Sequence, residues 1–266
     1  MPHKLLRSKQ QMSESMALAI VLTLAGGFQD AYSYNCRGNV FANAQTGNIV
    51  LLGQNIATGQ WAECLHYLFP ILAFLGGVFV TEWVRHLYKE RAGIHWRQIV
   101  LILEIILLAV AGILPQSFNV LSNVLMSFAC AMQVNSFRKF RGVPSATTMC
   151  IGNMRSATEC LCKYLITKQP ELRKKSLHYY FIIFIFAVGA ACGAILTGYI
   201  GEYAIWIPGA LLFIGFLMMF VKEDLEPNPQ FQQEMQKLHQ EEEKAEQKLD
   251  EVLHELKNKT SKNEKP

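Results

Sequence analysis

The stretch Asn43–Gln54, NAQTGNIVLLGQ, decides how this chain folds. It lies within 266 residues that are 51% hydrophobic, yet it opens with polar and small residues and holds only a short apolar run. Crossing a hydrocarbon layer of about 30 Å takes about 20 apolar helical residues. The stretch is therefore a loop, a short spanning helix or a polar element held inside a membrane protein, and the surrounding sequence decides between these.

Long apolar blocks surround this stretch and predict an all-α membrane protein whose spans contact lipid. Each block reaches the roughly 17 to 25 residues that cross a bilayer as a helix. Two further blocks, 46–58 and 148–162, are shorter and more polar. The predicted spans are residues 13–34, 66–88, 98–114, 118–136, 176–199 and 203–221.

The net charge of +4 conceals a division between the membrane portion and the tail. Residues 1–221 hold 17 Lys and Arg against 9 Asp and Glu, while residues 222–266 hold 8 against 12. The basic residues of the membrane portion fall between spans, where such residues set topology. The charge pattern therefore argues against a nucleic-acid partner.

Two topologies compete, with eight or with six crossings. Eight crossings place the basic clusters within 85–97 and 138–141 outside the cell, together with Arg37. Six crossings place both clusters in the cytoplasm with the N-terminus and the basic residues of 163–175, leaving only Arg37 outside. The bias towards cytoplasmic Lys and Arg favours six crossings and two cytoplasmic termini. The short blocks are then re-entrant and need a protein-lined interior, because lipid cannot satisfy free backbone groups.

The second short block resembles the first in its surroundings. FQDAYSYNCRGNVFANAQTGNIVLLG, from Phe28, matches MQVNSFRKFRGVPSATTMCIGNMRSA, from Met132. Each unit has three crossings, so the second is inverted relative to the first, as in many transporters. We expect repeat 1 at 13–114 and repeat 2 at 118–221, with chance similarity as the alternative. The shared features are Gln29 and Gln133, Arg37-Gly38 and Arg141-Gly142, and Gly47-Asn48 and Gly152-Asn153.

Each Gly-Asn pair is expected to begin a short helix whose free N–H groups face the membrane interior. Thr46 or Asn48 would cap the first helix, and Gly47 would allow a close approach. Two such helix ends suit an anion or the electron-rich end of a neutral solute. The alternative is that Gly and Asn only cap and pack the helices. The candidate site residues are Gln29, Asp30, Gln45, Thr46, Gly47 and Asn48 in one half, and Gln133, Asn135, Gly152, Asn153 and Arg155 in the other.

Glu104 is the most isolated charged residue inside a span, within LILEIILL. Such groups are costly in a membrane and indicate function. Glu104 is either a proton-coupling carboxyl or a protonated acid hydrogen-bonded to a neighbouring helix. Arg155 is expected to pair with Glu159, or with Asp30 across the repeat interface. The seven cysteines form no ligand cluster, so we predict no metal and no cofactor.

The tail at 222–266 differs in composition from the rest of the chain. Residues 231–257 are rich in Gln, Glu and Lys, with apolar residues at imperfect heptad spacing. They predict either a coiled coil that joins copies of the chain or a solvated single helix. Both this helix and the N-terminal residues 1–12 are expected in the cytoplasm.

Three motifs resemble the YoaK-like family of bacterial integral membrane proteins. They are GGFQDAYSY from Gly26, VFANAQTGNIVLLG from Val40 and GNMRSAT from Gly152. The resemblance covers roughly residues 12–222 and implies a multi-pass protein of the bacterial inner membrane, without naming a substrate or reaction. Cys150-Ile151 stands where the first half has Gln45-Thr46, so a polar role for those positions is not shared by both halves.

The sequence therefore predicts six transmembrane helices in two inverted three-helix repeats, each with a re-entrant or broken helix, plus a cytoplasmic helix. The function it favours is a small-solute transporter or channel-like permease, for an anion or coupled to protons, with its site between the repeats. A membrane-embedded enzyme is a weaker alternative, because paired His, HExxH, GxSxG and P-loop motifs are all missing from the sequence. A scaffold or regulator acting through the tail is a third.

Overall fold

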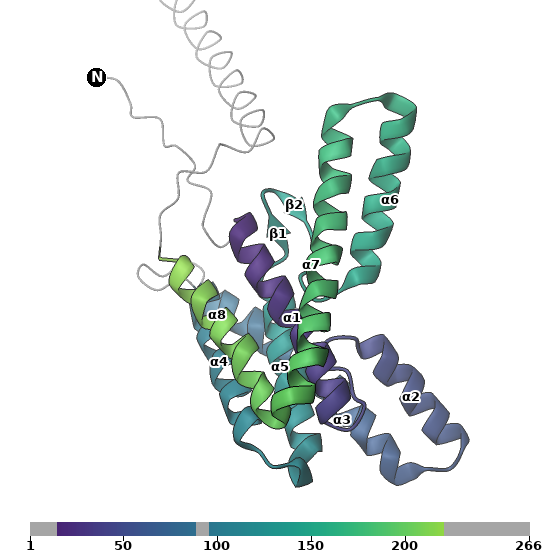
Figure 1. The fold of residues 1–266 in the computed structure, drawn as a ribbon, viewed down its shortest axis with the longest axis vertical. Coiled ribbons are helices and arrows are strands. Elements are labelled where there is room, and N and C mark those ends of the chain that lie inside the picture. The colour runs from purple at the N-terminus through teal and green to yellow at the C-terminus, as the bar shows by residue number, and fades with distance from the viewer. Residues whose placement is uncertain (1–14, 89–95, 221–266) are drawn as a thin grey trace, which may run out of the picture. The chain divides into compact units, whose positions relative to one another are not determined.

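The computed structural model describes residues 15–88 and 96–220, and helices make up most of them (Figure 1). The predicted tail helix at 222–266 and the N-terminal residues 1–12 lie outside the described residues. Within residues 15–88 and 96–220, the only strands form a two-stranded hairpin, β1 and β2, between α5 and α6. The elements are α1 (Met16–Cys36), α2 (Gln45–Ala57), α3 (Trp61–Tyr88), α4 (Trp96–Ile113), η2 (Gln116–Phe118), α5 (Asn119–Ser136), β1 (Lys139–Phe140), β2 (Val143–Pro144), α6 (Cys150–Thr167), α7 (Pro170–Ile200), η3 (Gly201–Ile205) and α8 (Trp206–Met218).

Long apolar helices make this a membrane protein. Four stretches of the described residues are long and apolar enough to cross a bilayer: Trp61–Tyr88, Trp96–Ile113, Gln116–Ser136 and Pro170–Met218. The last stretch contains two helices, α7 and α8, which join at η3. The predicted span at 13–34 forms α1 but is not among the four. Helix α1 carries Gln29, Asp30, Ser33 and Asn35 in its C-terminal half, which lowers its hydropathy.

Both short blocks are helices, as predicted. Helix α2 has 13 residues and is about 20 Å long, which is less than the bilayer core. Helix α6 has 18 residues and ends at Thr167, beyond the predicted block. Its exposed faces carry Arg155, Glu159 and Lys163 beside apolar residues, so its composition does not suit a lipid-facing span. Each short helix packs along the long helix that follows it, α2 on α3 and α6 on α7.

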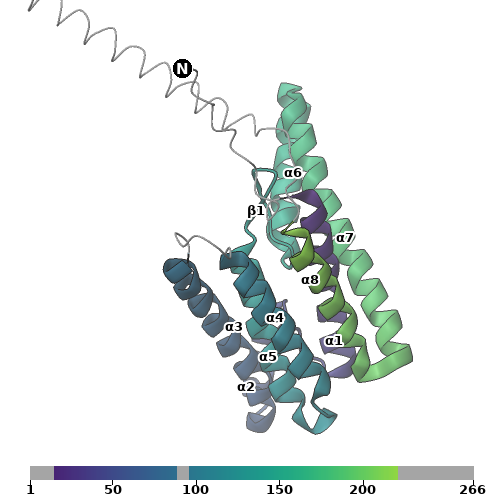
Figure 2. The same ribbon diagram turned by 90° about the vertical axis from the view of Figure 1, so that its left-hand side faces the viewer.

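The helices form two groups. The first helix of each half of the chain, α1 or α5, lies in the group formed by the other half. Figure 2 shows α2, α3, α4 and α5 on one side and α1, α6, α7 and α8 on the other. The first helix of the chain therefore packs along α7 and α8, and α5 packs along α3 and α4. The relation of α1 to α7 and α8 matches the relation of α5 to α3 and α4. The described bundle thus holds two four-helix units with the same order of packing.

Glycines let the long helices approach to backbone contact. A Cβ added at Gly27 would lie under 3.0 Å from the Phe186 carbonyl oxygen of α7, and one at Gly189 would clash with the Leu24 carbonyl of α1. On the other pair of helices, a Cβ at Gly77 would lie 2.5 Å from the Phe128 carbonyl oxygen. Small residues permit this kind of close crossing in membranes. The two crossings, α1 with α7 and α3 with α5, are therefore built in the same way.

Arg37 is fully buried just after α1, where it joins the ends of several helices. Its guanidinium donates to the Tyr32 hydroxyl (2.9 Å) and to two carbonyl oxygens at the end of α4, Leu114 (2.9 Å) and Ala111 (3.1 Å). The Glu202 carboxylate of η3 lies 4.0 Å away. A cation is favourable at the C-terminal end of a helix, where carbonyl groups lack partners. The sequence suggested only a charged residue in a loop at Arg37. In the structure this side chain is buried and joins the end of α1 to the end of α4.

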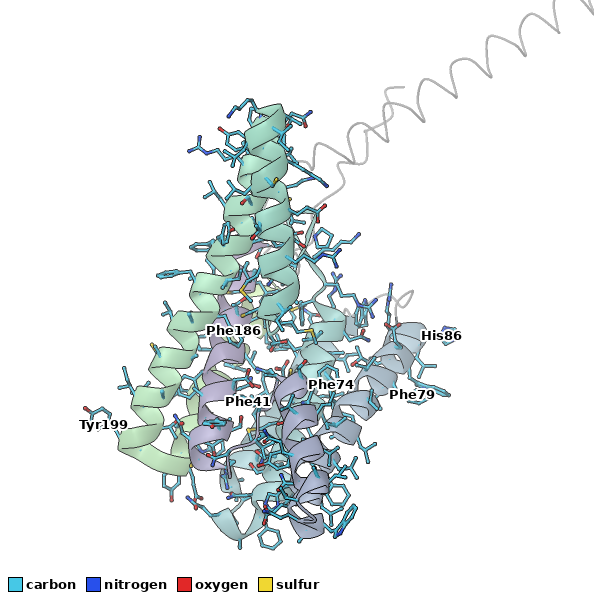
Figure 3. The ribbon with its side chains drawn as sticks, turned by 90° about the vertical axis from the view of Figure 1, so that its right-hand side faces the viewer. Phe41, Phe74, Phe79, His86, Phe186 and Tyr199 are labelled. Atoms are coloured by element: carbon cyan, nitrogen blue, oxygen red, sulfur yellow. The ribbon has the colours of Figure 1, made fainter. Side chains whose placement is uncertain are left out.

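Large apolar side chains are exposed on the outer faces of α3 and α7. Phe79 on α3 is 66% exposed and Tyr199 on α7 is 83% exposed. Both point away from the helices in Figure 3, as does His86 near the end of α3. In a membrane protein such side chains contact lipid, which agrees with the expected lipid contacts.

Candidate functional site

The connectors that precede α2 and α6 both reach the middle of α1, at Gly26. The Asn43 amide donates to the Gly26 carbonyl oxygen (2.7 Å). From the other connector, the Thr148 methyl carbon lies so close that a Cβ on Gly26 would stand 2.8 Å from it. Glycine at this position therefore lets two irregular segments approach one helix. These segments bring the starts of α2 and α6 to the same part of the bundle.

The two asparagines of the Gly-Asn pairs make identical backbone contacts. Asn48 accepts from the Phe41 N–H (3.1 Å) and donates to the Phe41 carbonyl oxygen (2.8 Å). Asn153 accepts from the Ala146 N–H (3.3 Å) and donates to the Ala146 carbonyl oxygen (2.7 Å). Each asparagine thus ties the connector seven residues before it to the first turn of its short helix. We call this contact the asparagine bracket.

Replacing Asn48 by alanine is expected to lower the melting temperature of the solubilised protein by roughly 5 °C. The substitution leaves the Phe41 N–H and carbonyl oxygen without partners, and an unmade buried hydrogen bond costs about 1–3 kcal/mol. Asn153→Ala should have a similar effect, since its bracket is the same. Differential scanning fluorimetry in detergent measures both.

Asn55→Ala is the matched control for the bracket, because Asn55 also lies on α2 but makes one local bond, to the Leu51 carbonyl oxygen. Its melting temperature should stay close to wild type. A melting temperature of Asn48→Ala equal to that of Asn55→Ala would show that the bracket does not stabilise the fold.

Asp30 and Ser33 of α1 accept from N–H groups of the connector that precedes α2. Its carboxylate accepts from the Asn43 N–H (2.7 Å), and the Ser33 hydroxyl, one turn further along α1, accepts from the Ala42 N–H (3.0 Å). The prediction that Thr46 or Asn48 caps α2 is wrong: the cap position is Ala44, without a side-chain cap bond. A carboxylate at a helix N-terminus is electrostatically favourable and does what a bound anion would do there.

The second connector contacts α5 through Gln133. The Gln133 amide donates to the Thr147 hydroxyl (2.9 Å) and to the Leu22 carbonyl oxygen of α1 (3.2 Å). One turn earlier, Cys130 lies 3.8 Å from the Thr148 hydroxyl. Gln45 of the first short helix reaches α5 as well, donating to the Ser127 hydroxyl (3.2 Å). Both halves of the chain therefore meet at α5.

Glu104 lies near these groups, fully buried on α4. The Gln29 side chain of α1 lies beside its carboxyl without a hydrogen bond between them, and Cys130 lies near both Glu104 and Asp30. The residues of this region come from α1, α4, α5, α2 and the two connectors. We define the central polar cluster as Gln29, Asp30, Asn43, Gln45, Glu104, Ser127, Cys130, Gln133, Thr147 and Thr148.

Several atoms of the cluster are buried and lack a hydrogen-bond partner within the described residues. They are both carboxyl oxygens of Glu104, the Gln29 amide nitrogen, and the amide oxygens of Asn43 and Gln133. More than nine in ten buried polar groups in native proteins have a partner. Each of these atoms therefore needs an explanation, and five of the nine such atoms among the described residues belong to the cluster.

The structure brings together only part of the predicted site. Gln29, Asp30, Gln45 and Gln133 lie in the central polar cluster, and so does Glu104, the proton-coupling candidate. Asn48 and Asn153 stand beside the cluster, held in their brackets. Gly47 packs against the ring of Phe41, which Figure 3 shows near α2. The remaining predicted residues lie elsewhere: Thr46, Gly152 and Arg155 are exposed, and Asn135 lies at the end of α5, where it donates to the Glu82 carboxylate (3.0 Å).

Arg155 does not supply a positive charge to the cluster. Glu159, its expected partner, forms its ion pair with Lys163 instead (2.6 Å). The alternative partner, Asp30, is buried, whereas Arg155 is exposed. In an α-helix both neighbours at i−4 and i+4 are within reach, and the sequence alone did not rank them.

The sequence analysis missed Asn43, Ser127, Thr147 and Thr148. A signal for two of them was present: Asn43 and Thr148 each precede the bracket asparagine of their half by five residues. Aligning the halves on Asn48 and Asn153 would have paired them. Residues 15–88 and 96–220 contain no group of three or more His, Cys, Asp or Glu placed to hold a metal ion.

Comparison with known proteins agrees with the motifs. The family model described as "Protein of unknown function (DUF1275)" matches residues 18–218. The UPF0700 transmembrane protein YoaK of Bacillus subtilis (strain 168) is 28% identical over 212 residues, which is 76% of this chain and 92% of that protein. No solved structure matches the chain. The resemblance to YoaK-like proteins is thereby confirmed, and the chain belongs to the DUF1275 family.

Proposed function

We propose that the protein is a small-solute permease of the bacterial inner membrane, and that the central polar cluster is its binding site. The observation that supports this best is the set of buried polar atoms without partners among the described residues, with Glu104 at its centre. A charged or polar group in a membrane is costly unless it pairs or serves a substrate pathway. A solute that bonds to these atoms would account for them.

The architecture behind this proposal is a pair of inverted repeats. In each repeat a spanning helix is followed by a helix that we interpret as re-entrant, α2 or α6, and then by two further spanning helices, so three crossings per repeat invert the second. The equal order of packing, the two glycine crossings and the two asparagine brackets support this interpretation. Transporters of this kind bind solutes where the repeats meet, near broken helices. The cluster draws on both sequence repeats, through Asn43 and Gln45 in residues 13–114 and Gln133 and Thr147 in residues 118–221.

The orientation follows from the charges of the loops. Six crossings, with α2 and α6 re-entrant, leave the basic residues near Arg138 and Lys163 in the cytoplasm with both termini. Arg37 then lies on the outer side, where its charge is neutralised by the end of α4. The proposed activity is transport without covalent chemistry, since the cluster offers amides, hydroxyls and carboxyls for binding. An association of copies through the tail remains a proposal from the sequence.

Replacing Glu104 by glutamine should lower solute flux by about tenfold or more while the protein stays folded. Glutamine keeps the size of the side chain but removes its charge, and a hydrogen bond to a charged group contributes about 1.5–3 kcal/mol. The assay is uptake of labelled methylammonium, glycerol and acetate into proteoliposomes. Glu171→Gln, at the exposed start of α7, is the matched control and should leave flux unchanged.

Folding is followed separately by size-exclusion chromatography and melting. Wild-type vesicles that take up none of the three solutes faster than protein-free vesicles would contradict the permease. Equal flux in wild type and a folded Glu104→Gln variant would show that the site lies elsewhere.

A further inference from the structure

The atoms of the central polar cluster that lack a partner are mostly acceptors. Within the described residues, four are oxygens that can accept a hydrogen bond, two of Glu104 and one each of Asn43 and Gln133. The one nitrogen, Nε2 of Gln29, belongs to the side chain that lies beside the Glu104 carboxyl. A solute that complements this set must therefore bring mainly N–H or O–H donors.

Three N–H groups in the connectors that lead into α2 and α6 already bond to side chains of the protein. The Asn43 N–H bonds to the Asp30 carboxylate, and the Phe41 and Ala146 N–H groups bond to the bracket asparagines. Side chains of the protein thus accept from N–H groups of the two connectors, two and four residues before α2 and four residues before α6. An anion placed there would meet the Asp30 carboxylate, and like charges at short range repel. The anion expected from the sequence does not fit this arrangement.

The cluster contains two buried carboxyl groups, and no described cationic side chain pairs with either of them. Asp30 and Glu104 are both buried, and neither forms an ion pair with a Lys, Arg or His of residues 15–88 and 96–220. Arg37, on the same helix as Asp30, is committed to Tyr32 and to the carbonyl oxygens at the end of α4. Asp30 has a backbone N–H partner, whereas Glu104 has none. Glu104 is therefore the group that a positive charge would neutralise.

We propose that the central polar cluster binds a small nitrogenous cation that carries N–H donors, of the alkylammonium or guanidinium class. The positive charge pairs with the Glu104 carboxylate, and the remaining N–H groups donate to the amide oxygens of Asn43 and Gln133. This inference rests on the proposed function and names its substrate class. It differs from a general cation preference, because a quaternary ammonium ion has the charge but no N–H donor.

The test measures binding to the purified full-length protein by thermal shift. The probes are millimolar chloride salts of methylammonium and guanidinium, with tetramethylammonium for charge without donors, urea for donors without charge, and sodium acetate for an anion. Methylammonium or guanidinium should raise the melting temperature saturably by about 3 °C, as a ligand of the native state does. The other probes should not, and Glu104→Gln should remove the shift, whereas Glu171→Gln should keep it.

Three results would overturn the inference: a shift with acetate, an equal shift with tetramethylammonium and methylammonium, or no shift with any probe. The vesicle assay separates this outcome from the fate of the permease. If methylammonium binds but does not enter vesicles, the permease proposal is contradicted and the cation-site proposal is supported. Glycerol or acetate flux without cation binding would do the reverse.

Discussion

Replacing Gly27 by alanine is expected to lower the melting temperature of the solubilised protein by roughly 10 °C. The added Cβ would overlap the Phe186 carbonyl oxygen and approach the Ala190 nitrogen to 2.9 Å, and both belong to the backbone of α7. A backbone cannot turn aside as a side chain does, so α1 and α7 must move apart. Overpacking of this kind costs about 3 kcal/mol or more. Gly189→Ala tests the same crossing from α7, since its Cβ would overlap the Leu24 carbonyl group.

Gly198→Ala is the control, and its expected change in melting temperature has the opposite sign. Gly198 also lies within α7, but a Cβ there meets nothing within 4 Å. Alanine favours an exposed helix over glycine by up to about 1 kcal/mol, so this variant should melt at or slightly above the wild-type temperature. Differential scanning fluorimetry in detergent measures the melting temperatures of Gly27→Ala, Gly189→Ala and Gly198→Ala. If Gly27→Ala melts like Gly198→Ala, then α1 and α7 do not cross in backbone contact.

Replacing Arg37 by methionine is expected to have an effect of the same size. Methionine fills similar space but leaves the Tyr32 hydroxyl and the carbonyl oxygens of Leu114 and Ala111 without their donor. Breaking a buried charged network by removing one member costs about 3–5 kcal/mol. The melting temperature should fall by roughly 10 °C or more. The yield of monodisperse protein after extraction should fall with it.

The control for Arg37 is Arg173→Met, near the exposed start of α7. Both variants remove one arginine, so any difference reflects burial and not net charge. Arg37→Lys refines the test, because lysine keeps the charge but cannot donate in three directions from a planar group. It should recover only part of the stability. An Arg37→Met protein with the melting temperature of wild type would show that the hydrogen bonds of Arg37 do not stabilise the fold.

The sequence was sufficient for the helices because apolar length is a local property. The blocks at 46–58 and 148–162 became α2 and α6, and the shared Gly-Asn pairs led to Asn48 and Asn153. Glu104 could also be identified from local sequence, because a single carboxyl group within an apolar run stands out without knowledge of its contacts. The role of the asparagines was less accessible. An amide suits a ligand or a backbone segment equally well, and only the structure shows the bracket to Phe41 and Ala146.

Other features depended on contacts between residues far apart in the sequence. Arg37 looked like a loop charge because Leu114 and Ala111, which receive its hydrogen bonds, lie at the end of another helix. The connectors that hold Asn43 and Thr147 have no hydrophobic period, so no periodicity indicated the contacts of these side chains with Gly26 and Gln133. The anion expected at two helix N-termini stays a prediction, and near α2 it would lie close to Asp30, which accepts from the connector before that helix. Local patterns thus predicted the segments, and long-range contacts decided their chemistry.

The pairing of α1 with α7 also bears on how the chain is made. Gly27 leaves the ribosome long before Phe186, and synthesis at about 5–20 residues per second puts roughly ten seconds or more between them. During this interval the first helix carries Gln29 and Asp30 without the partner that covers its glycine face. An isolated helix of this composition is poorly suited to lipid. We therefore expect that α1 stays beside the translocon, or is bound by an insertion factor, until α7 has been synthesised.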